Sequence, residues 1–312
     1  MKTTVGVAMA MCLSCGVFGQ EPEAVSQRDQ DAWIRWLIPL PKEAAIPQKL
    51  TLAPADVKLT LLDKSPEGQQ ALRKLEQIFL DKAGATGTET AVEIILGLVD
   101  KNGKVGGLAV PDAARLATLP NADQAYLIRS LPGGKVLLAA RTPAGLLYAG
   151  TTYAQLLESA FKGNVLSLPL ATITDWPDLE ERGLWGGSSV RDIEWMAARK
   201  MNALEFHCPH TVSPEGVMSG TVSPALLGRG RANAMKMIPI ISHINHLGRR
   251  GVYKAYPELR GKGKKALITS HGTDMYAPCA SQPKLREVLA GWLVDFAKDE
   301  QVRDICCWLG EL

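Results

Sequence analysis

The sequence lacks a large excess of either charge. Its 312 residues include 35 basic and 32 acidic side chains, which leaves a formal net charge of +3. An imbalance this small does not produce the strongly basic surface of proteins dedicated to nucleic acids. We therefore expect no nucleic-acid partner, and the 46% of hydrophobic residues indicates a globular protein.

Cysteines at the spacing of a metal site are also lacking from the part of the chain that should fold. Two of the six cysteines, Cys12 and Cys15, precede that part, and the others form no paired motif: Cys208, Cys279, Cys306 and Cys307. An HExxH zinc motif is absent as well. We expect no metal and no organic cofactor, and we interpret the four cysteines as buried free thiols.

No apolar run is long enough to cross a membrane. The chain begins with Lys2 and a short apolar stretch that ends in Val17-Phe18-Gly19, which is typical of a signal peptide cleaved after Gly19. Residues 1–19 are therefore a predicted leader, and the mature protein is expected to be secreted or periplasmic. A lipoprotein is the alternative, because Leu13-Ser14-Cys15 brings a cysteine to the end of the apolar run.

Strand and helix patterns alternate in the first half of the chain. Ser65-Pro66-Glu67 is a strong helix start and Gly84 a plausible stop. Pro132-Gly133-Gly134 joins two strands of a hairpin. The predicted strands are residues 57–62, 91–99, 125–130, 135–140 and 168–175, and the predicted helices 65–84 and 143–159. This pattern predicts an α/β domain over residues 30–176.

From residue 177 the pattern changes to strand, loop and helix units of the kind that build a (β/α)8 barrel. The predicted strands are residues 183–187, 203–207, 237–242 and 305–309. One helix is expected to begin at Ser188 or Ser189 and to end at Lys200, whose charge is favourable at a helix C-terminus. A second helix is expected to begin at Ser281 as its N-cap. A closed barrel needs eight such strands. We therefore expect residues 177–312 to form an incomplete TIM barrel, as a fragment or as a chain whose copies pair.

Barrel enzymes place their catalytic groups at the carboxyl ends of the strands. That position selects Arg182, His207, His246 and Glu311 as candidates. A carboxyl at the mouth of a strand suits a general acid, which favours Glu311 for that role. From position alone, Glu311 could equally be a solvated residue, and the two histidines, taken in isolation, are more often structural.

Several segments resemble the family 20 glycoside hydrolases, the β-N-acetylhexosaminidase-like enzymes. LIRSLPGGKVLLAARTPAGLLYAGTTYAQLLE and LPLATITDWPDLEERGL are similar to the end of that family's N-terminal domain, and ARKMNALEFHCPH to its second barrel strand. Tyr256-Pro257-Glu258-Leu259 and ICCWLGE also match family motifs. The resemblance implies a zincin-like α+β N-terminal domain followed by a truncated (β/α)8 TIM barrel.

The resemblance also implies roles for the four candidates. Arg182, in the Arg-Gly pair that opens the barrel, would hold hydroxyls of the terminal sugar, although an ion pair at the domain interface is the alternative. His207 and His246 take the places of active-site histidines, and Glu311 takes that of the catalytic acid. Gly310 stands where the family has the aspartate that orients the sugar's 2-acetamido group.

These observations predict a secreted glycoside hydrolase that removes terminal amino sugars from an oligosaccharide or glycoconjugate. Two alternatives stay open. The first is a uronic-acid glycosidase resembling the α-glucuronidases, since the basic segment RGKGKK would attract an anionic glycan. The second is a non-catalytic glycan-binding protein, which the glycine at position 310 favours.

Overall fold

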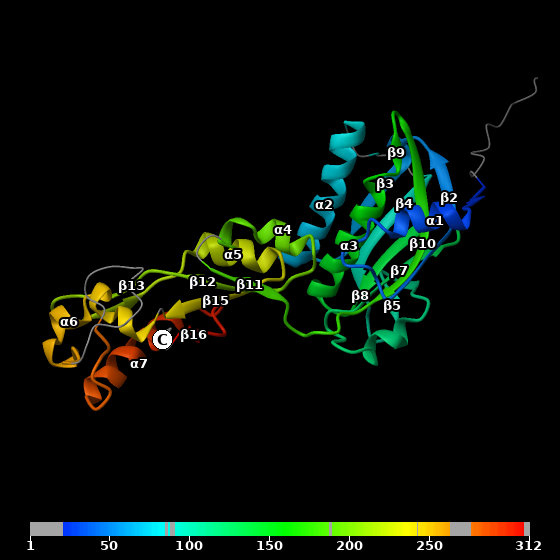
Figure 1. Cartoon of the computed structure of the whole chain (residues 1–312). Helices are drawn as coiled ribbons and strands as arrows, with labels where there is room; N and C mark the ends of the chain where they lie inside the picture. The colour runs from blue at the N-terminus through cyan, green and yellow to red at the C-terminus, as the bar shows by residue number, and fades with distance from the viewer. Residues whose placement is uncertain are drawn as a thin grey trace, which may run out of the picture.

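The computed structural model describes residues 21–84, 87, 91–186, 189–241, 243–262 and 276–308. The predicted signal peptide and Glu311 lie outside these ranges. Figure 1 shows two lobes, each built around one sheet. We call them the first lobe, residues 21–176, and the second lobe, residues 177–308.

The first lobe contains an eight-stranded mixed sheet in the order β1-β2-β10-β7-β8-β4-β3, with β9 paired to β10. Strands β3, β4 and β8 are parallel and the other pairs are antiparallel. The predicted hairpin is confirmed, because Tyr126 pairs with Ala140 and Leu131 with Lys135. The strands are β1 (Glu23–Ala24), β2 (Glu43–Leu52), β3 (Val57–Leu61), β4 (Val92–Leu98), β7 (Tyr126–Leu131), β8 (Lys135–Ala140), β9 (Phe161–Lys162) and β10 (Val165–Asp175).

Helices α2 (Pro66–Ala83) and α3 (Pro143–Leu157) cover one face of this sheet, and α1 (Gln27–Ile34) lies at β2. The local signals for α2 act as predicted: the Ser65 side chain accepts from the Gly68 amide, and Gly84 ends the helix with φ of 78°. The opposite face is covered by β5 (Lys104–Val105), β6 (Leu108–Ala109) and η2 (Ala113–Ala117). Both faces of the sheet are therefore buried.

The second lobe contains a four-stranded parallel sheet in sequence order, β11-β12-β15-β16. Its strands are β11 (Gly183–Trp185), β12 (Ala203–His207), β15 (Lys236–Ile241) and β16 (Cys306–Cys307), so all four predicted strands are present, although β11 and β16 are shorter than expected. The surrounding elements are η3 (Ser189–Arg191), α4 (Ile193–Ala197), β13 (His210–Val212), β14 (Met218–Gly220), α5 (Pro224–Ala232), η4 (Ile244–Arg250), α6 (Val252–Ala255), η5 (Pro257–Leu259) and α7 (Pro283–Phe296).

Two local predictions in the second lobe were wrong. The N-cap of α7 is Gln282 rather than Ser281, and no side chain caps this helix. The helix expected to end at Lys200 is the short α4, and Lys200 lies beyond it with φ of 56° and a buried side chain. Four parallel strands in sequence order are consistent with part of a barrel, but the expected truncated (β/α)8 TIM barrel is not confirmed.

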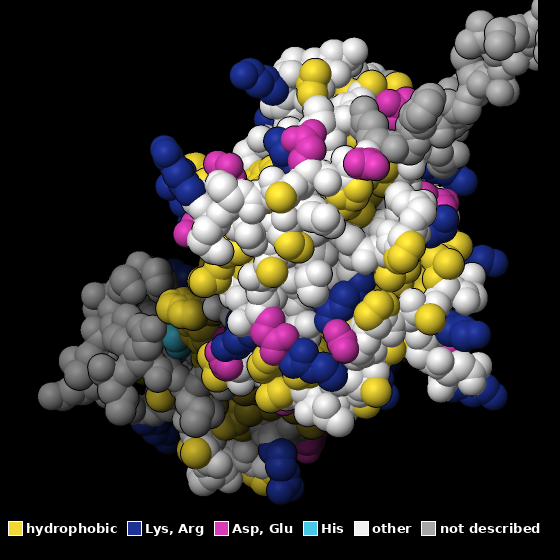
Figure 2. All heavy atoms as spheres, turned by 90° about the vertical axis from the view of Figure 1, so that its right-hand side faces the viewer, with side chains coloured by type: hydrophobic (Ala, Val, Ile, Leu, Met, Phe, Trp, Pro, Cys, Tyr) yellow, Lys and Arg dark blue, Asp and Glu magenta, His cyan; other side chains and the backbone are white. Residues whose placement is uncertain are grey.

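The surface of the first lobe mixes both charges. Figure 2 shows Lys and Arg side chains interspersed with Asp and Glu on the face it presents, with hydrophobic side chains in small groups between them. No field of one sign dominates the described part of that face, as the small net charge of the sequence predicts. Within the described ranges, no helix combines the length and the apolar character that a membrane span requires.

Candidate functional site

Aromatic and imidazole side chains gather at the carboxyl edge of the second sheet. Trp185 is the last residue of β11 and His207 the last of β12, while His243 lies two residues after β15 and Trp308 one residue after β16. Because the four strands are parallel, their carboxyl ends meet at one edge. We call the group Trp185, His207, His243, His246 and Trp308 the aromatic edge.

Trp308 lies at the centre of the aromatic edge. Its ring centroid is 4.9 Å from that of Trp185, 5.0 Å from that of His243 and 5.7 Å from that of His207, all in edge-to-face geometry. His243 in turn contacts His246, with centroids 4.7 Å apart. Such T-shaped contacts are the preferred arrangement of aromatic rings, so they hold one another in fixed orientations.

The backbone also fixes Trp308. Its amide donates to the Ile241 carbonyl at 3.1 Å, and its carbonyl accepts from the Ile244 amide at 3.2 Å. These bonds tie the end of β16 to the loop that carries His243 and His246. Trp185 is 63% exposed and His246 only 7%, so the edge has an accessible indole at one side and a buried imidazole at the other.

This arrangement suits a sugar ring. The faces of indole rings are electron-rich and attract the polarised C–H groups of a pyranose, while imidazoles donate to or accept from hydroxyl groups. No group of three or more His, Cys, Asp or Glu residues within the described ranges could hold a metal ion. The described side chains of the aromatic edge offer aromatic rings and imidazoles to a ligand.

The structure brings two of the four predicted site residues together. His207 and His246 both lie at the aromatic edge. Glu311 lies outside the described residues, three positions after Trp308 in the sequence. Trp185, His243 and Trp308 were not selected from the sequence, although their places at or just after the ends of predicted strands were a signal that could have found them.

Arg182 lies at the other end of the sheet, at the amino end of β11. Its guanidinium donates to the Lys200 carbonyl, the Leu179 carbonyl and the Gln124 side chain at 2.5–3.0 Å. Asn202 joins the same group by accepting from the Arg182 amide at 2.8 Å. Gln124 belongs to the first lobe, so Arg182 lies at the contact between the lobes, but these partners are carbonyl and amide oxygens rather than the carboxylate of the expected ion pair. The length of strand β11 separates Arg182 from the aromatic edge.

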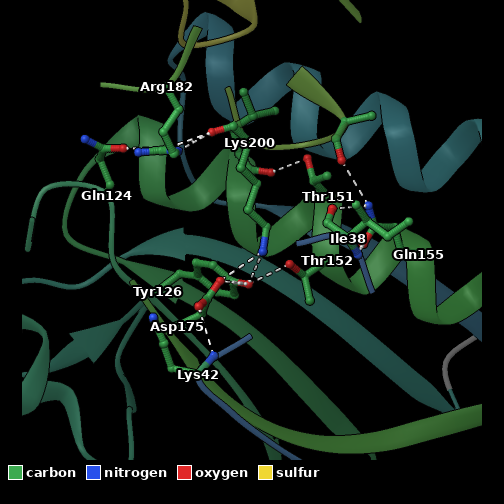
Figure 3. Close-up of polar contacts among 12 residues, drawn as sticks. Ile38, Lys42, Gln124, Tyr126, Thr151, Thr152, Gln155, Asp175, Arg182 and Lys200 are labelled. Atoms are coloured by element: carbon green, nitrogen blue, oxygen red, sulfur yellow. Dashed lines mark hydrogen bonds and ion pairs between the residues drawn. The ribbon is translucent and has the colours of Figure 1, made fainter. Parts of the chain in front are cut away.

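Lys200 lies beside Arg182 and forms the buried centre of the junction between the lobes (Figure 3). Its ammonium donates to Asp175 at 2.9 Å and to the Tyr126 hydroxyl at 2.7 Å. Burial lowers the pKa of Lys200, and the Asp175 charge opposes that shift. Tyr126 also donates to Asp175, and the Lys42 amide donates to the second carboxylate oxygen at 3.1 Å, so the carboxylate has several partners.

Residues 36–176 match the family model described as glycosyl hydrolase family 20, domain 2. No curated protein sequence matches the chain. Among solved structures, the chitobiase of Flavobacterium johnsoniae is similar with a TM-score of 0.58 and 17% identity, over 88% of this chain and 44% of that one. An exo-β-N-acetylglucosaminidase of Vibrio harveyi in complex with N-acetylglucosamine has a TM-score of 0.59 and 15% identity, over 89% and 47%.

The β-N-acetylhexosaminidase of Bacteroides fragilis has a TM-score of 0.54 and 16% identity, over 84% of this chain and 55% of that one. This chain thus spans about half the length of the enzymes it resembles, and at these identities the likeness is one of fold. Residues 36–176 are thus similar to domain 2 of glycosyl hydrolase family 20, and over most of its length the chain has the fold of these solved family 20 structures.

Proposed function

We propose that the protein is an exported glycoside hydrolase that removes terminal N-acetylated amino sugars from a glycan. The observation that carries this proposal is the aromatic edge, where side chains from four parallel strands and their loops converge at the end of the sheet used by barrel enzymes. The four strands would belong to a (β/α)8 barrel. The domain 2 match and the fold of the family 20 enzymes support the same class of reaction.

In the proposed reaction Glu311 is the general acid and base. It would protonate the glycosidic oxygen as the bond to the anomeric carbon breaks, and then accept a proton from the water that completes hydrolysis. Trp185 and Trp308 would pack on the sugar ring, and His207 would bind its hydroxyl groups. His246 would orient the neighbouring His243, whose ring it contacts.

Gly310 sets one condition on this mechanism. In family 20 the 2-acetamido oxygen of the sugar attacks the anomeric carbon, and a neighbouring acceptor orients that amide. A glycine has no side chain to accept the amide proton. Three alternatives follow: another carboxylate is the acceptor, the true substrate is a sugar without the acetamido group, such as a uronic acid, or the protein binds the sugar without hydrolysing it.

Chromogenic glycosides test the proposal. The protein is incubated with the p-nitrophenyl β-glycosides of N-acetylglucosamine and of N-acetylgalactosamine and with the p-nitrophenyl α- and β-glucuronides. Release of nitrophenol from the N-acetylated substrates alone supports the proposal, whereas release from a glucuronide supports the uronic-acid alternative. Saturable binding of N-acetylglucosamine without turnover of any substrate would support a non-catalytic glycan-binding protein.

The role of Glu311 is tested with a matched pair of variants. Glu311→Gln removes the transferable proton and should lower kcat at least about 100-fold, the size of effect expected for a general acid. Glu300→Gln makes the same chemical change on an exposed residue and should leave kcat unchanged. Equal rates for the two variants would remove Glu311 from the mechanism.

Export is tested separately. Expression of the full sequence in a host with a secretory pathway, followed by N-terminal sequencing of the released protein, should give a chain that begins at Gln20. A mature terminus at Cys15 would instead identify a lipoprotein.

A further inference from the structure

A cavity of about 220 Å³ lies where the two lobes meet, far from the aromatic edge. We call it the junction cavity. The first lobe contributes Tyr126 and Tyr148 to its wall, the second contributes Arg182 and Lys200, and the connecting residues 176–179 close one side. A single water needs about 10–15 Å³ of such volume, so the cavity has room for a small organic molecule.

The Tyr148 hydroxyl gives the first indication of a ligand. Tyr148 is 1% exposed, and its hydroxyl has no hydrogen-bond partner within the described part of the chain. The Arg182 guanidinium carbon is 5.9 Å from the centroid of the Tyr148 ring, and since a guanidinium only donates, Arg182 cannot accept the phenolic proton. A buried hydroxyl without a partner costs about 1–3 kcal/mol, so an acceptor in the cavity would be bound favourably.

Tyr148 stays a donor at neutral pH. Burial raises the pKa of this hydroxyl to about 12, although the charge of Arg182 acts in the opposite direction. Lys200, on the same wall, has three ammonium protons and uses two of them for Asp175 and the Tyr126 hydroxyl. Both groups can therefore donate to an oxygen of a ligand.

The charges that line the cavity favour an anion. Lys42 pairs with Asp178 and Lys200 pairs with Asp175, so these four charges cancel. Among the residues that the structure describes, the Arg182 guanidinium donates to carbonyl and amide oxygens and to no carboxylate, so its positive charge at the wall is not neutralised there. Figure 3 shows Arg182 and Lys200 side by side at this junction.

The remaining wall is mainly apolar and aromatic, with contributions from Pro39, Leu40, Trp176, Pro177 and Leu179. We propose that the junction cavity binds a small monocarboxylate with an apolar ring face, at a site separate from the proposed sugar site. Its carboxylate accepts from the Tyr148 hydroxyl near Arg182, and its ring packs against the aromatic and proline side chains. An aromatic acid and a uronic acid monosaccharide share this chemistry.

Ligand-observed NMR and calorimetric titrations of the full chain test the proposal with benzoate, glucuronate and N-acetylglucosamine. At least one of the two carboxylates should bind saturably with one site, and the tighter of the two identifies the source. Its affinity should persist in Glu311→Gln and in the presence of excess N-acetylglucosamine, because the site is independent of the sugar site. Absence of saturable binding by both carboxylates overturns the proposal, and so does competition by the neutral sugar.

Two matched variants on α3 locate the site. Tyr148→Phe removes only the unpartnered hydroxyl and should weaken carboxylate binding about tenfold, the effect of one hydrogen bond to a charged acceptor. Tyr153→Phe makes the same change on the same helix, where the hydroxyl donates to the Pro169 carbonyl at 3.0 Å and does not line the cavity. Equal affinities in the two variants would overturn the assignment, and the thermal unfolding of each variant without ligand verifies that it is folded.

Discussion

The two lobes bury their sheets to different degrees. In the first lobe β8 is buried along five of its six residues, and helices on one face and a hairpin with η2 on the other exclude water. In the second lobe all three residues of β11 are exposed, including Leu184 at 41%. Parallel strands are normally buried on both faces, so the second sheet as described has less core per strand than the first.

The two lobes also differ in where side chains accessible to a ligand lie. The first lobe has the packing of a self-contained domain, while the second holds all four histidines of the described residues and the exposed indole of Trp185. Side chains that must meet a ligand cannot also be covered by core. The junction around Lys200 therefore joins a lobe with a closed core to a lobe whose aromatic edge is open.

The largest expected effect comes from breaking that junction. Asp175→Asn leaves the buried Lys200 ammonium without its charged partner, and removing one member of a buried pair destabilises a protein by about 3–5 kcal/mol. We expect chemical unfolding, followed by tryptophan fluorescence and far-UV circular dichroism, to become biphasic, with the second lobe unfolding first. The control is Asp178→Asn, whose carboxylate is 75% exposed and should contribute less than about 1 kcal/mol. Equal losses in the two variants would show that the junction does not couple the lobes.

A second prediction separates the lobes by pH. His210 is buried in the second lobe against Trp292, with ring centroids 5.0 Å apart, and its Nδ1 is 3.0 Å from the Cys208 carbonyl. Burial, helped by the charge of Arg250, lowers the pKa of His210 to about 4. Because the folded-state pKa lies below the unfolded value of about 6.5, the unfolded state takes up a proton first as the pH falls. The free energy of unfolding is therefore at its full value above pH 6.5 and decreases as the pH falls toward 4.

Through His210, the free energy of unfolding of the second lobe should decrease by roughly 2–3 kcal/mol between pH 7 and pH 4, while that of the first lobe should not change through this group. Urea unfolding at pH 7, 5.5 and 4 measures it. His210→Asn keeps a donor for the Cys208 carbonyl but cannot be protonated in this range, so its stability should vary less with pH than that of the natural protein. The same pH dependence in both proteins would mean that acid acts through other groups.

Local signals in the sequence explain which elements could be predicted. Ser65 and Gly84 define the ends of α2 by their own hydrogen bond and left-handed backbone, so neighbouring residues suffice. The strand at Ala203–His207 was also predicted residue for residue, since it is a short apolar run between polar segments. Its last residue, His207, is at the carboxyl edge because parallel strands all end there.

Long-range packing explains what could not be predicted. The local sequence around Lys200 predicts a charge at the end of a helix, but its partners Asp175 and Tyr126 lie 25 and 74 residues earlier in the chain. Its positive φ is not predicted by any local pattern either. The aromatic edge was found only in part, because Trp185 and Trp308 look like core residues until the register of the parallel strands places them at an exposed end.

The smallest expected effect decides between the two interpretations of Arg182. If Arg182 serves the junction, Arg182→Lys loses part of a planar fork that reaches Leu179, Lys200 and Gln124, and should destabilise the protein by about 1–2 kcal/mol. The affinity for N-acetylglucosamine should then stay within about twofold of that of the natural protein, because Arg182 would not contact the sugar. For scale, a tenfold change in affinity corresponds to about 1.4 kcal/mol of binding free energy. His207→Ala is the comparison, since His207 lies at the aromatic edge and its loss should weaken sugar binding more than that of Arg182. A tenfold loss of affinity in Arg182→Lys with unchanged stability would instead show that Arg182 binds the sugar. The substrate would then have to reach the amino end of β11.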